Sequence, residues 1–206
     1  MAAKPTHRRA LRPAVVAAAA TVGLSATAIP AGAAPAAPTA PAAPSRTDQS
    51  TGGNHITAAN RQAIAQTAVN EHNTPERNHE IGVNCNAYSG FFGTGAPCAN
   101  GWRAEEWCSD FAIYTWKAGG ADVRGLNAGS VSFYRYGLNH GTWHWGSAGV
   151  QPGDAVVYGL NSAGTFSEHV GVYVGNGYVI SGNYHDRIWK HPIAEAGVIS
   201  GYASPV

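Results

Sequence analysis

A cysteine, a histidine and an asparagine, far apart in the chain, have the residue types that thiol chemistry needs. They are Cys108, His169 and Asn183. A cysteine thiolate is a strong nucleophile, a histidine can accept its proton, and a polar side chain can orient the imidazole. The sequence therefore raises the hypothesis of a nucleophilic cysteine site, provided that the fold brings these three side chains together.

The odd number of cysteines requires one of them to be unpaired within the chain. Cys85 and Cys98 lie in a segment rich in Asn, Gly and Pro. Cys108 lies in a predicted helix, where its geometry is less suited to pairing with a loop partner ten residues earlier. We predict a Cys85–Cys98 disulfide, worth about 3 kcal/mol by the chain-entropy argument, and a free thiol at Cys108.

The position of Cys108 near the start of a predicted helix favours a thiolate, because unpaired N–H groups and the helix dipole stabilise negative charge there. The nearby carboxylates of Glu105, Glu106 and Asp110 oppose it. A reactive thiol therefore needs a cationic histidine beside it, and iodoacetamide should then label it at mildly acidic pH. The alternative is a small buried hydrophobic residue, for which labelling should be slow.

His169 stands out among the nine histidines because it lies in a strand of a predicted hairpin. The turn 174–178 contains Gly-Asn-Gly, which suits a tight connection. A three-residue loop pairs Val174 with Tyr178 and sets His169 opposite Asn183, whereas a two-residue loop sets it opposite Tyr184. In the first register Asn183 can bond to the imidazole; the alternative is a half-exposed strand histidine beside a polar neighbour.

Alternation in this strand separates a valine face from a face that carries His169 and Gly171. The valines at 170, 172 and 174 should point into the core. Gly171 leaves the other face open to the close approach of a helix end or a ligand.

The elements that must position these side chains follow from the hydrophobic pattern. Helices are predicted at 57–71, capped by Thr57, and at 103–118, stopped by Gly119 and Gly120, with a short helix at 131–138. Residues 73–101 should form a loop region. Strands are predicted at 154–160, 168–174, 178–183, 188–191 and 198–202. Helices followed by strands predict an α+β fold, with helices packed on an antiparallel sheet.

The N-terminal region is typical of an exported protein. Residues 1–12 contain four basic side chains, residues 13–29 are apolar, and the small residues at 31–33 offer a cleavage site. We interpret 1–33 as a signal peptide, which favours general secretion over the twin-arginine route and over a retained membrane anchor. Residues 34–55 read as an Ala/Pro-rich linker, and residues 56–206 as one domain.

Charge argues against a nucleic-acid partner. Removal of 1–33 takes away four of 13 basic residues and none of the 12 acidic ones, so the net charge changes from +1 to −3. No basic surplus remains to neutralise phosphates. We expect a secreted monomer without stable membrane association.

Four segments, taken in order, resemble the CHAP family of secreted cysteine amidohydrolases and peptidases, which is related to NlpC-type papain-like enzymes. They are Glu106-Trp107-Cys108-Ser109-Asp110-Phe111, Pro152-Gly153-Asp154-Ala155-Val156-Val157-Tyr158, His169-Val170-Gly171-Val172-Tyr173-Val174 and Ile180-Ser181-Gly182-Asn183. The resemblance implies an α+β papain-like fold and hydrolysis of amide bonds in peptidoglycan. It implies either an N-acetylmuramoyl-L-alanine amidase or an endopeptidase of stem or cross-bridge peptides, without a cofactor.

Carried over by position, the resemblance makes Cys108 the nucleophile and His169 the general base. The third role falls on Asn183, because Ser181 stands where the family often has Glu; Ser181 and Asp186 are lesser candidates. The backbone N–H of Cys108 can help to hold the oxyanion.

A second oxyanion donor should come from the segment before the nucleophile. Tyr88 and Ser89 are the candidates for this role or for substrate contact, and the alternative is that Tyr88 packs beside the disulfide. Trp107 and Trp116 should be core residues, while Trp143 and Trp145 remain open between core and substrate groove.

Two other kinds of function remain. One is a catalytically silent domain of the same fold that binds cell wall or glycan through aromatic side chains. The other is a zinc-dependent wall hydrolase based on His140 and His144, which Gly141 and Trp143 disfavour because they interrupt helical ligand spacing. We expect no metal.

Overall fold

Helices dominate the first half of the folded region and strands the second half. The computed structural model describes residues 56–206, so the predicted signal peptide (1–33) and linker (34–55) lie outside the described residues. The helices are α1 (Ala58–His72), α2 (Ala87–Phe92), α3 (Cys108–Ala118) and α4 (Val131–His140), with a 3-10 turn at Ala99–Gly101. The strands are β1 (Cys85–Asn86), β2 (Ala96–Pro97), β3 (Arg103–Ala104), β4 (Trp143–Trp145), β5 (Ala155–Tyr158), β6 (His169–Gly175), β7 (Tyr178–Ser181), β8 (Trp189–Pro192) and β9 (Ile199–Ala203). The predicted α+β class is confirmed.

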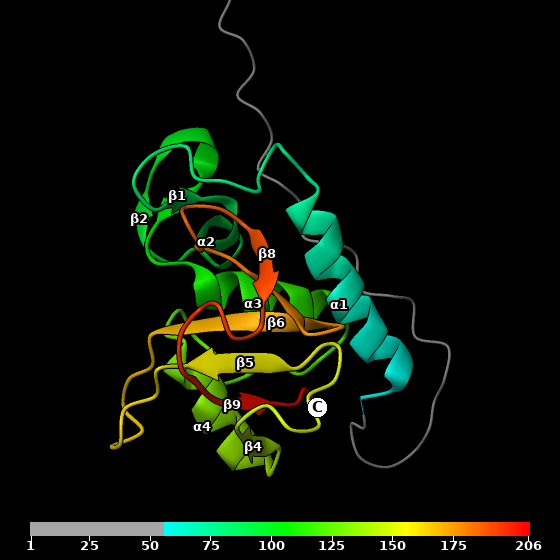
Figure 1. Cartoon of the computed structure of the whole chain (residues 1–206). Coiled ribbons are helices and arrows are strands. Elements are labelled where there is room, and N and C mark those ends of the chain that lie inside the picture. Colours follow the sequence, from blue (N-terminus) through cyan, green and yellow to red (C-terminus); the bar gives the residue numbers. More distant parts are fainter. Residues whose placement is uncertain (1–55) are drawn as a thin grey trace, which may run out of the picture. The chain divides into compact units, whose positions relative to one another are not determined.

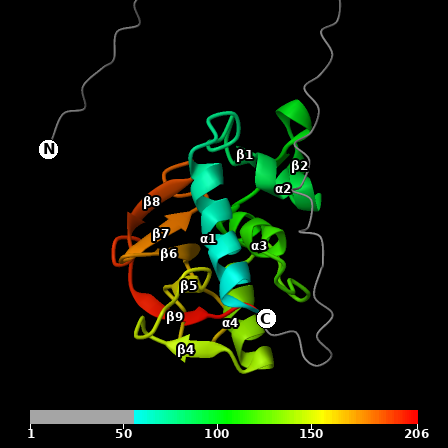
Figure 2. The ribbon, with the colours of Figure 1, turned by 90° about the vertical axis from the view of Figure 1, so that its right-hand side faces the viewer.

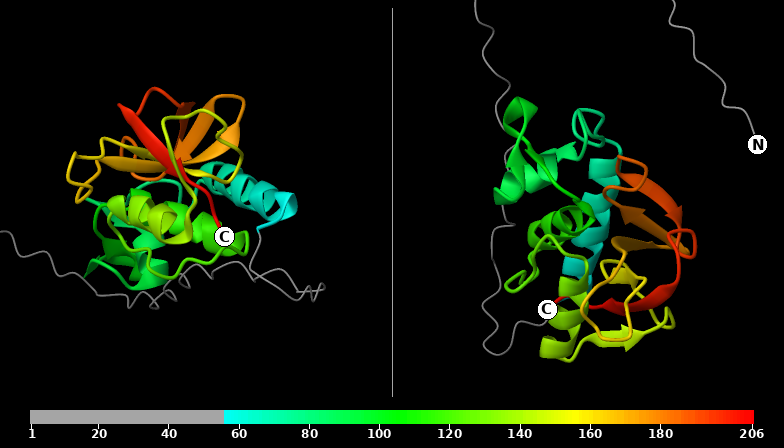
Figure 3. Two further views of the ribbon diagram at one scale, coloured as in Figure 1. Left: turned by 90° about the horizontal axis from the view of Figure 1, so that it is seen from below. Right: turned by 90° about the vertical axis from the view of Figure 1, so that its left-hand side faces the viewer.

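The main sheet has six strands in the order β4-β9-β5-β6-β7-β8, and every neighbouring pair is antiparallel. Helices α1, α3 and α4 cover one face of this sheet (Figures 1 and 2). The view from below in Figure 3 shows the strands and the helices as two layers. The five strands predicted after residue 152 are all present, and the structure adds β4.

The alternation of the strands supplies a core on each face of the sheet. On the helical face, Val157, Val170 and Val172 pack with Phe111 and Trp116 of α3. On the opposite face, a smaller cluster contains Val156, Tyr158, Val179 and Tyr202. The predicted core positions of Trp107 and Trp116 are confirmed, because both side chains are fully buried.

Helix α1 begins where the sequence predicts. The Thr57 hydroxyl accepts from the backbone N–H of Asn60, and the Asn60 side chain accepts from the backbone N–H of Thr57, which forms a capping box. Arg61, one turn into the helix, pairs with the buried Asp154, the residue immediately before β5, so the helix is held to the sheet by an ion pair as well as by packing. Within residues 56–206, no helix combines the length and apolarity needed to cross a bilayer.

Helix α3 begins five residues later than predicted. Arg103 and Ala104 form β3 instead, which pairs with both β1 and β2 in a small three-stranded sheet. The region predicted as a loop, 73–101, therefore holds short strands and helix α2. The predicted Cys85–Cys98 disulfide is present in this region, and Cys108 is a free cysteine.

The β6–β7 hairpin has the predicted register at its centre but a different turn. Gly175 pairs with Tyr178, so the loop has two residues, and a bulge between Tyr173 and Gly175 shifts the register by one. Val172 consequently faces Ile180, as the three-residue loop also required. The bulge absorbs the extra residue, and His169 therefore lies on the predicted face, opposite the valine core.

Candidate active site

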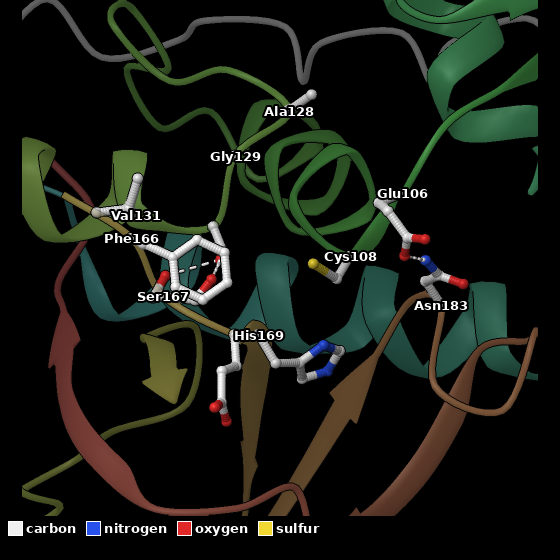
Figure 4. A pocket seen from close by; sticks show the side chains of 11 residues that line it. Glu106, Cys108, Ala128, Gly129, Val131, Phe166, Ser167, His169 and Asn183 are labelled. Carbon is white, nitrogen blue, oxygen red and sulfur yellow. Dashed lines mark hydrogen bonds between the residues drawn. The ribbon is translucent and has the colours of Figure 1, made fainter. Parts of the chain in front are cut away.

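A pocket of about 450 Å³ lies between the start of α3, the start of α4 and the start of β6. Figure 4 shows Cys108 and His169 in this pocket, with Glu106 and Asn183 together at one side of it. The lining residues are Glu106, Cys108, Ala128, Gly129, Ser130, Val131, Phe166, Ser167, Glu168, His169 and Asn183. Residues from four separate stretches of the sequence thus meet around one free thiol.

Cys108 is the first residue of α3, which is closer to the helix end than the sequence implied. Its backbone N–H is one of the first in the helix and has no partner within it. The residue is only 8% exposed, and burial raises the pKa of its thiol to about 11. Backbone hydrogen bonds from Val170 and Ser109 act against this rise in the pKa, and the charges of Glu106 and Asp110 add to it.

His169 is the first residue of β6 and pairs with Tyr158 of β5. Burial lowers the pKa of its imidazole to about 4, and the neighbouring His191 lowers this pKa further. Its Nε2 atom is buried and has no hydrogen-bond partner among the described residues. Nδ1 is not among the buried atoms without a partner, so it is the ring nitrogen that can exchange a proton with a group in the pocket.

These two shifts correct one expectation from the sequence. With the pKa of Cys108 near 11 and that of His169 near 4, the substrate-free pair is a neutral thiol and a neutral imidazole at neutral pH. The expectation from the sequence was a thiolate beside a cationic histidine, because the unpaired N–H groups and the dipole at a helix start stabilise negative charge. Burial outweighs that contribution, because it removes the solvation of both charged forms.

Asn183 lines the pocket but does not bond to His169. Strand β7 ends at Ser181, and Asn183 has a φ of 53°, which turns its side chain out of the strand pattern. Its amide donates to Glu106 Oε2 at 2.5 Å, and the amide of Asn84 donates to Glu106 Oε1 at 3.1 Å. The hydrogen bond predicted from the cross-strand register is therefore replaced by a contact at the pocket rim.

The structure does not place Tyr88 and Ser89 at the pocket. Both side chains are fully buried in α2. The Tyr88 hydroxyl donates to Glu71 at 2.8 Å, and the Ser89 hydroxyl donates to Asp110 at 2.6 Å. Because both hydroxyls form hydrogen bonds inside the protein, the predicted role of these residues as oxyanion or substrate groups is corrected to a structural one.

The remaining sequence candidates also lie outside the pocket lining. Asp186 is exposed in the connection between β7 and β8. His140 bonds to the carbonyl of Tyr136, and His144 stacks on Tyr202. Within residues 56–206, no three His, Cys, Asp or Glu side chains are grouped so as to hold a metal ion.

Sequence reasoning missed most of the pocket wall. The segment from Ala128 to Val131 leads into α4, and Phe166 to Glu168 precede the histidine. The Ser130 hydroxyl donates to the Ser167 carbonyl at 2.8 Å, which joins the two walls. A loop of small residues before a helix has no sequence pattern that would mark it as a pocket wall. Glu106 could have been placed in the pocket from the sequence, because it lies only two residues before Cys108.

Comparison with known proteins finds similar structures but no match by sequence. No family model and no curated protein matches the chain. NlpC2 from Trichomonas vaginalis is 16% identical with a TM-score of 0.47, over 73% of this chain and 49% of that one, so this chain spans about half its length. The P60 domain of an antigen from M. avium subspecies paratuberculosis is 18% identical with a TM-score of 0.46, over 70% and 96%.

The NlpC/p60 domain of the peptidoglycan hydrolase SagA is also similar. It is 18% identical with a TM-score of 0.44, over 70% of this chain and 97% of that one. Identities below 25% and TM-scores below 0.5 transfer no activity to this chain. Its membership of the CHAP family stays a prediction.

Proposed function

We propose that this protein is a secreted cysteine hydrolase that cleaves amide bonds in peptidoglycan. The observation that carries the proposal is that the free thiol of Cys108, at the first residue of a helix, lines one pocket with the imidazole of His169. A nucleophile and a base in a shared cavity are the minimum set for acyl transfer.

The first step is attack of the Cys108 sulfur on the amide carbonyl carbon. The thiol proton passes to Nδ1 of His169, which is unprotonated at neutral pH because its pKa is low; the bound substrate must make this transfer favourable, since a low pKa also makes the imidazole a weak base. A carbon–sulfur bond forms and the carbonyl oxygen gains the negative charge. The N–H of Cys108 lies at the helix start, where it can donate to that oxygen.

The second step releases the amine and then the acid. The imidazolium returns its proton to the leaving nitrogen as the carbon–nitrogen bond breaks, which leaves a thioester on Cys108. Water, deprotonated by the same imidazole, attacks the thioester and frees the carboxylic acid. The thiol and the neutral imidazole are then restored, so no redox partner or cofactor is consumed.

The substrate assignment rests on the resemblance of four segments to the CHAP family. It commits to peptidoglycan and to one of two bonds: the N-acetylmuramoyl–L-alanine amide, or a peptide bond in the stem or cross-bridge. Export is supported independently by the signal-like residues 1–33 and by the Cys85–Cys98 disulfide, a bond that is typical of oxidising compartments.

The direct test is digestion of purified peptidoglycan, followed by mass spectrometry of the released fragments. The wild type should release fragments with a new amine and a new carboxylate, and Cys108→Ala should release none. A chelator should leave the digestion unchanged. Wild-type protein that releases nothing, or activity that survives in Cys108→Ala, would contradict the proposal.

A second candidate is a wall- or glycan-binding domain without catalysis. It is favoured by one observation: Trp145 is 67% exposed and lies against Trp143 and Tyr134, which forms an aromatic surface outside the pocket. Aromatic faces are suited to stacking on sugar rings. If this candidate is correct, pulled-down peptidoglycan should retain the protein undigested, and Trp145→Ala should weaken retention while Cys108→Ala leaves it unchanged.

A further inference from the structure

The imidazole of His169 has one nitrogen for which the surrounding protein provides no bonded acceptor. When Nδ1 acts as the base, the proton of the neutral ring must reside on Nε2. That atom is buried and has no hydrogen-bond partner among residues 56–206. A buried N–H without an acceptor is unfavourable, so the productive state should supply one.

Ser181, at the end of β7, is a polar residue whose side chain lies on the same face of the sheet as His169. Continuing the register from the Val172–Ile180 pair sets Ser181 opposite Gly171, two residues from His169 on the same face of β6. A β-carbon at residue 171 would stand 2.2 Å from Ser181 Oγ. The absence of a side chain at Gly171 is therefore what gives the serine hydroxyl its room.

Ser181 is held in turn by His191 of β8. Ser181 Oγ lies 3.0 Å from His191 Nε2, and His191 Nδ1 lies 2.9 Å from the carbonyl oxygen of Pro192. A carbonyl oxygen only accepts, so His191 Nδ1 carries the proton and its Nε2 is the acceptor. The serine hydroxyl consequently donates to His191, and the lone pairs of its oxygen remain free to accept.

We propose that Ser181 and His191 are positioning residues for His169: Ser181 Oγ accepts the Nε2–H of His169, and His191 fixes the serine hydroxyl in the orientation that makes this possible. The inference rests on the proposed function, since it assigns the orienting part of the same site. The role of orienting the imidazole, predicted for Asn183, is thereby assigned to Ser181 and His191, a buried pair on β7 and β8. The amide of Asn183 donates to Glu106 instead.

The packing around His169 supports this arrangement. The ring of Tyr184 stacks on His191 with centroids 4.4 Å apart, and it lies 5.7 Å from the ring of His169. Tyr158 lies on another side of His169, at 6.0 Å. The two histidines therefore share Tyr184 as an aromatic neighbour, and the proposal requires the His169 ring to turn so that Nε2 faces the serine.

The test is the tautomer of His169, read by ¹⁵N NMR of the substrate-free protein at neutral pH. The wild type should show the Nε2–H form as the main species, with His191 in the Nδ1–H form. Ser181→Ala, which removes one oxygen and adds no bulk, should give a mixed tautomer at His169. It should lower kcat on the order of 10-fold or more while KM changes less than about two-fold.

His191 is tested by a pair of substitutions. His191→Phe keeps the ring that stacks on Tyr184 and removes the acceptor, so it should reproduce the tautomer shift and the loss in kcat of Ser181→Ala. His191→Gln supplies an acceptor oxygen and should restore most of both. His144→Phe is the matched control, because His144 also stacks on a tyrosine but lies outside the pocket lining, and it should change neither quantity.

The tautomer is measured without substrate, so its outcome is independent of whether the protein cleaves peptidoglycan. An inactive wild type that still shows the predicted tautomer changes would contradict the proposed function and leave the positioning pair in place. A His169 tautomer that is unaffected by Ser181→Ala and by His191→Phe would overturn the positioning pair, even in an active enzyme.

Discussion

Cys108 opens helix α3 and His169 opens strand β6, and their side chains line one pocket without a hydrogen bond between them. The lack of a hydrogen bond between them fits a resting state in which the Cys108 thiol and the His169 imidazole are both neutral. Catalytic hydrogen bonds are often long before substrate binds and shorten in the reactive complex. The substrate therefore has to bring about the proton transfer that the empty pocket does not favour.

Alkylation of Cys108 reports this resting state directly. Because burial raises the pKa of the thiol to about 11, the thiolate fraction at pH 7 is small, and iodoacetamide labelling should be on the order of 100-fold slower than for an unfolded cysteine. The rate should rise with pH up to about 11. Rapid labelling at pH 6 that disappears in His169→Ala would instead indicate the ion pair expected from the sequence.

The activity should tolerate acid better than an ordinary histidine would allow. The pKa of His169 is lowered to about 4, so the base remains unprotonated above that pH. On soluble wall fragments, kcat/KM should stay level between about pH 5 and 7 and fall as the pH drops through about 4. An acid limb near pH 6.5, the ordinary histidine value, would show that the imidazole is not buried in the working enzyme.

Asp110, in the first turn of α3, should destabilise the protein at neutral pH. Burial raises its pKa to about 6, and the nearby Glu105 carboxyl raises this pKa further, so the folded state binds a proton more tightly than the unfolded state. Stability is therefore lost as the pH rises from about 4 through 6.

Asp110→Asn should remove this cost while keeping an acceptor oxygen for Ser89. We expect the variant to gain roughly 1–3 kcal/mol in the free energy of unfolding at pH 7 and little at pH 4, measured by urea denaturation. Glu105→Gln is the companion variant and should show a change of the same sign. A variant that is less stable at pH 7 than the wild type would contradict the assignment.

The Cys85–Cys98 disulfide should contribute to stability and indirectly to the site. It closes a loop with a sequence separation of 13, and its β1 pairs with β3, which leads into α3. Removing the bond with Cys85→Ser and Cys98→Ser together should cost about 3 kcal/mol in the free energy of unfolding. Cys108 labelling should remain specific in this double variant, since Cys108 has no part in the bond.

Much of this fold can be predicted from the sequence because the periodic segments are strong. The strand alternation around Val170 and Val172 fixed which face meets the helices, and Thr57 marked the start of α1. The start of α3 was misplaced, because the pairing of Arg103 with β1 and β2 is a tertiary contact that no local pattern encodes.

The sequence was sufficient to predict the reactive pair, Cys108 and His169, but not the residues that surround them. Cys108 was identified by elimination of the paired cysteines, and His169 by its hairpin. The proposed partner of His169, Ser181, ranks only as a lesser candidate in the sequence, because its role depends on His191, which lies on a strand whose register the sequence leaves open. The balance between helix terminus and burial at Cys108 likewise depends on packing that only the structure contains.

The central claim is that Cys108 forms a covalent acyl intermediate with the help of His169. It is tested most directly by intact-protein mass spectrometry of a reaction with wall fragments that is quenched in acid at early times. The wild type should gain the mass of the acyl fragment, mapped by peptide analysis to Cys108, and Cys108→Ala and His169→Ala should gain none. Turnover by the wild type with no adduct on Cys108, or cleavage by Cys108→Ala, would contradict the claim.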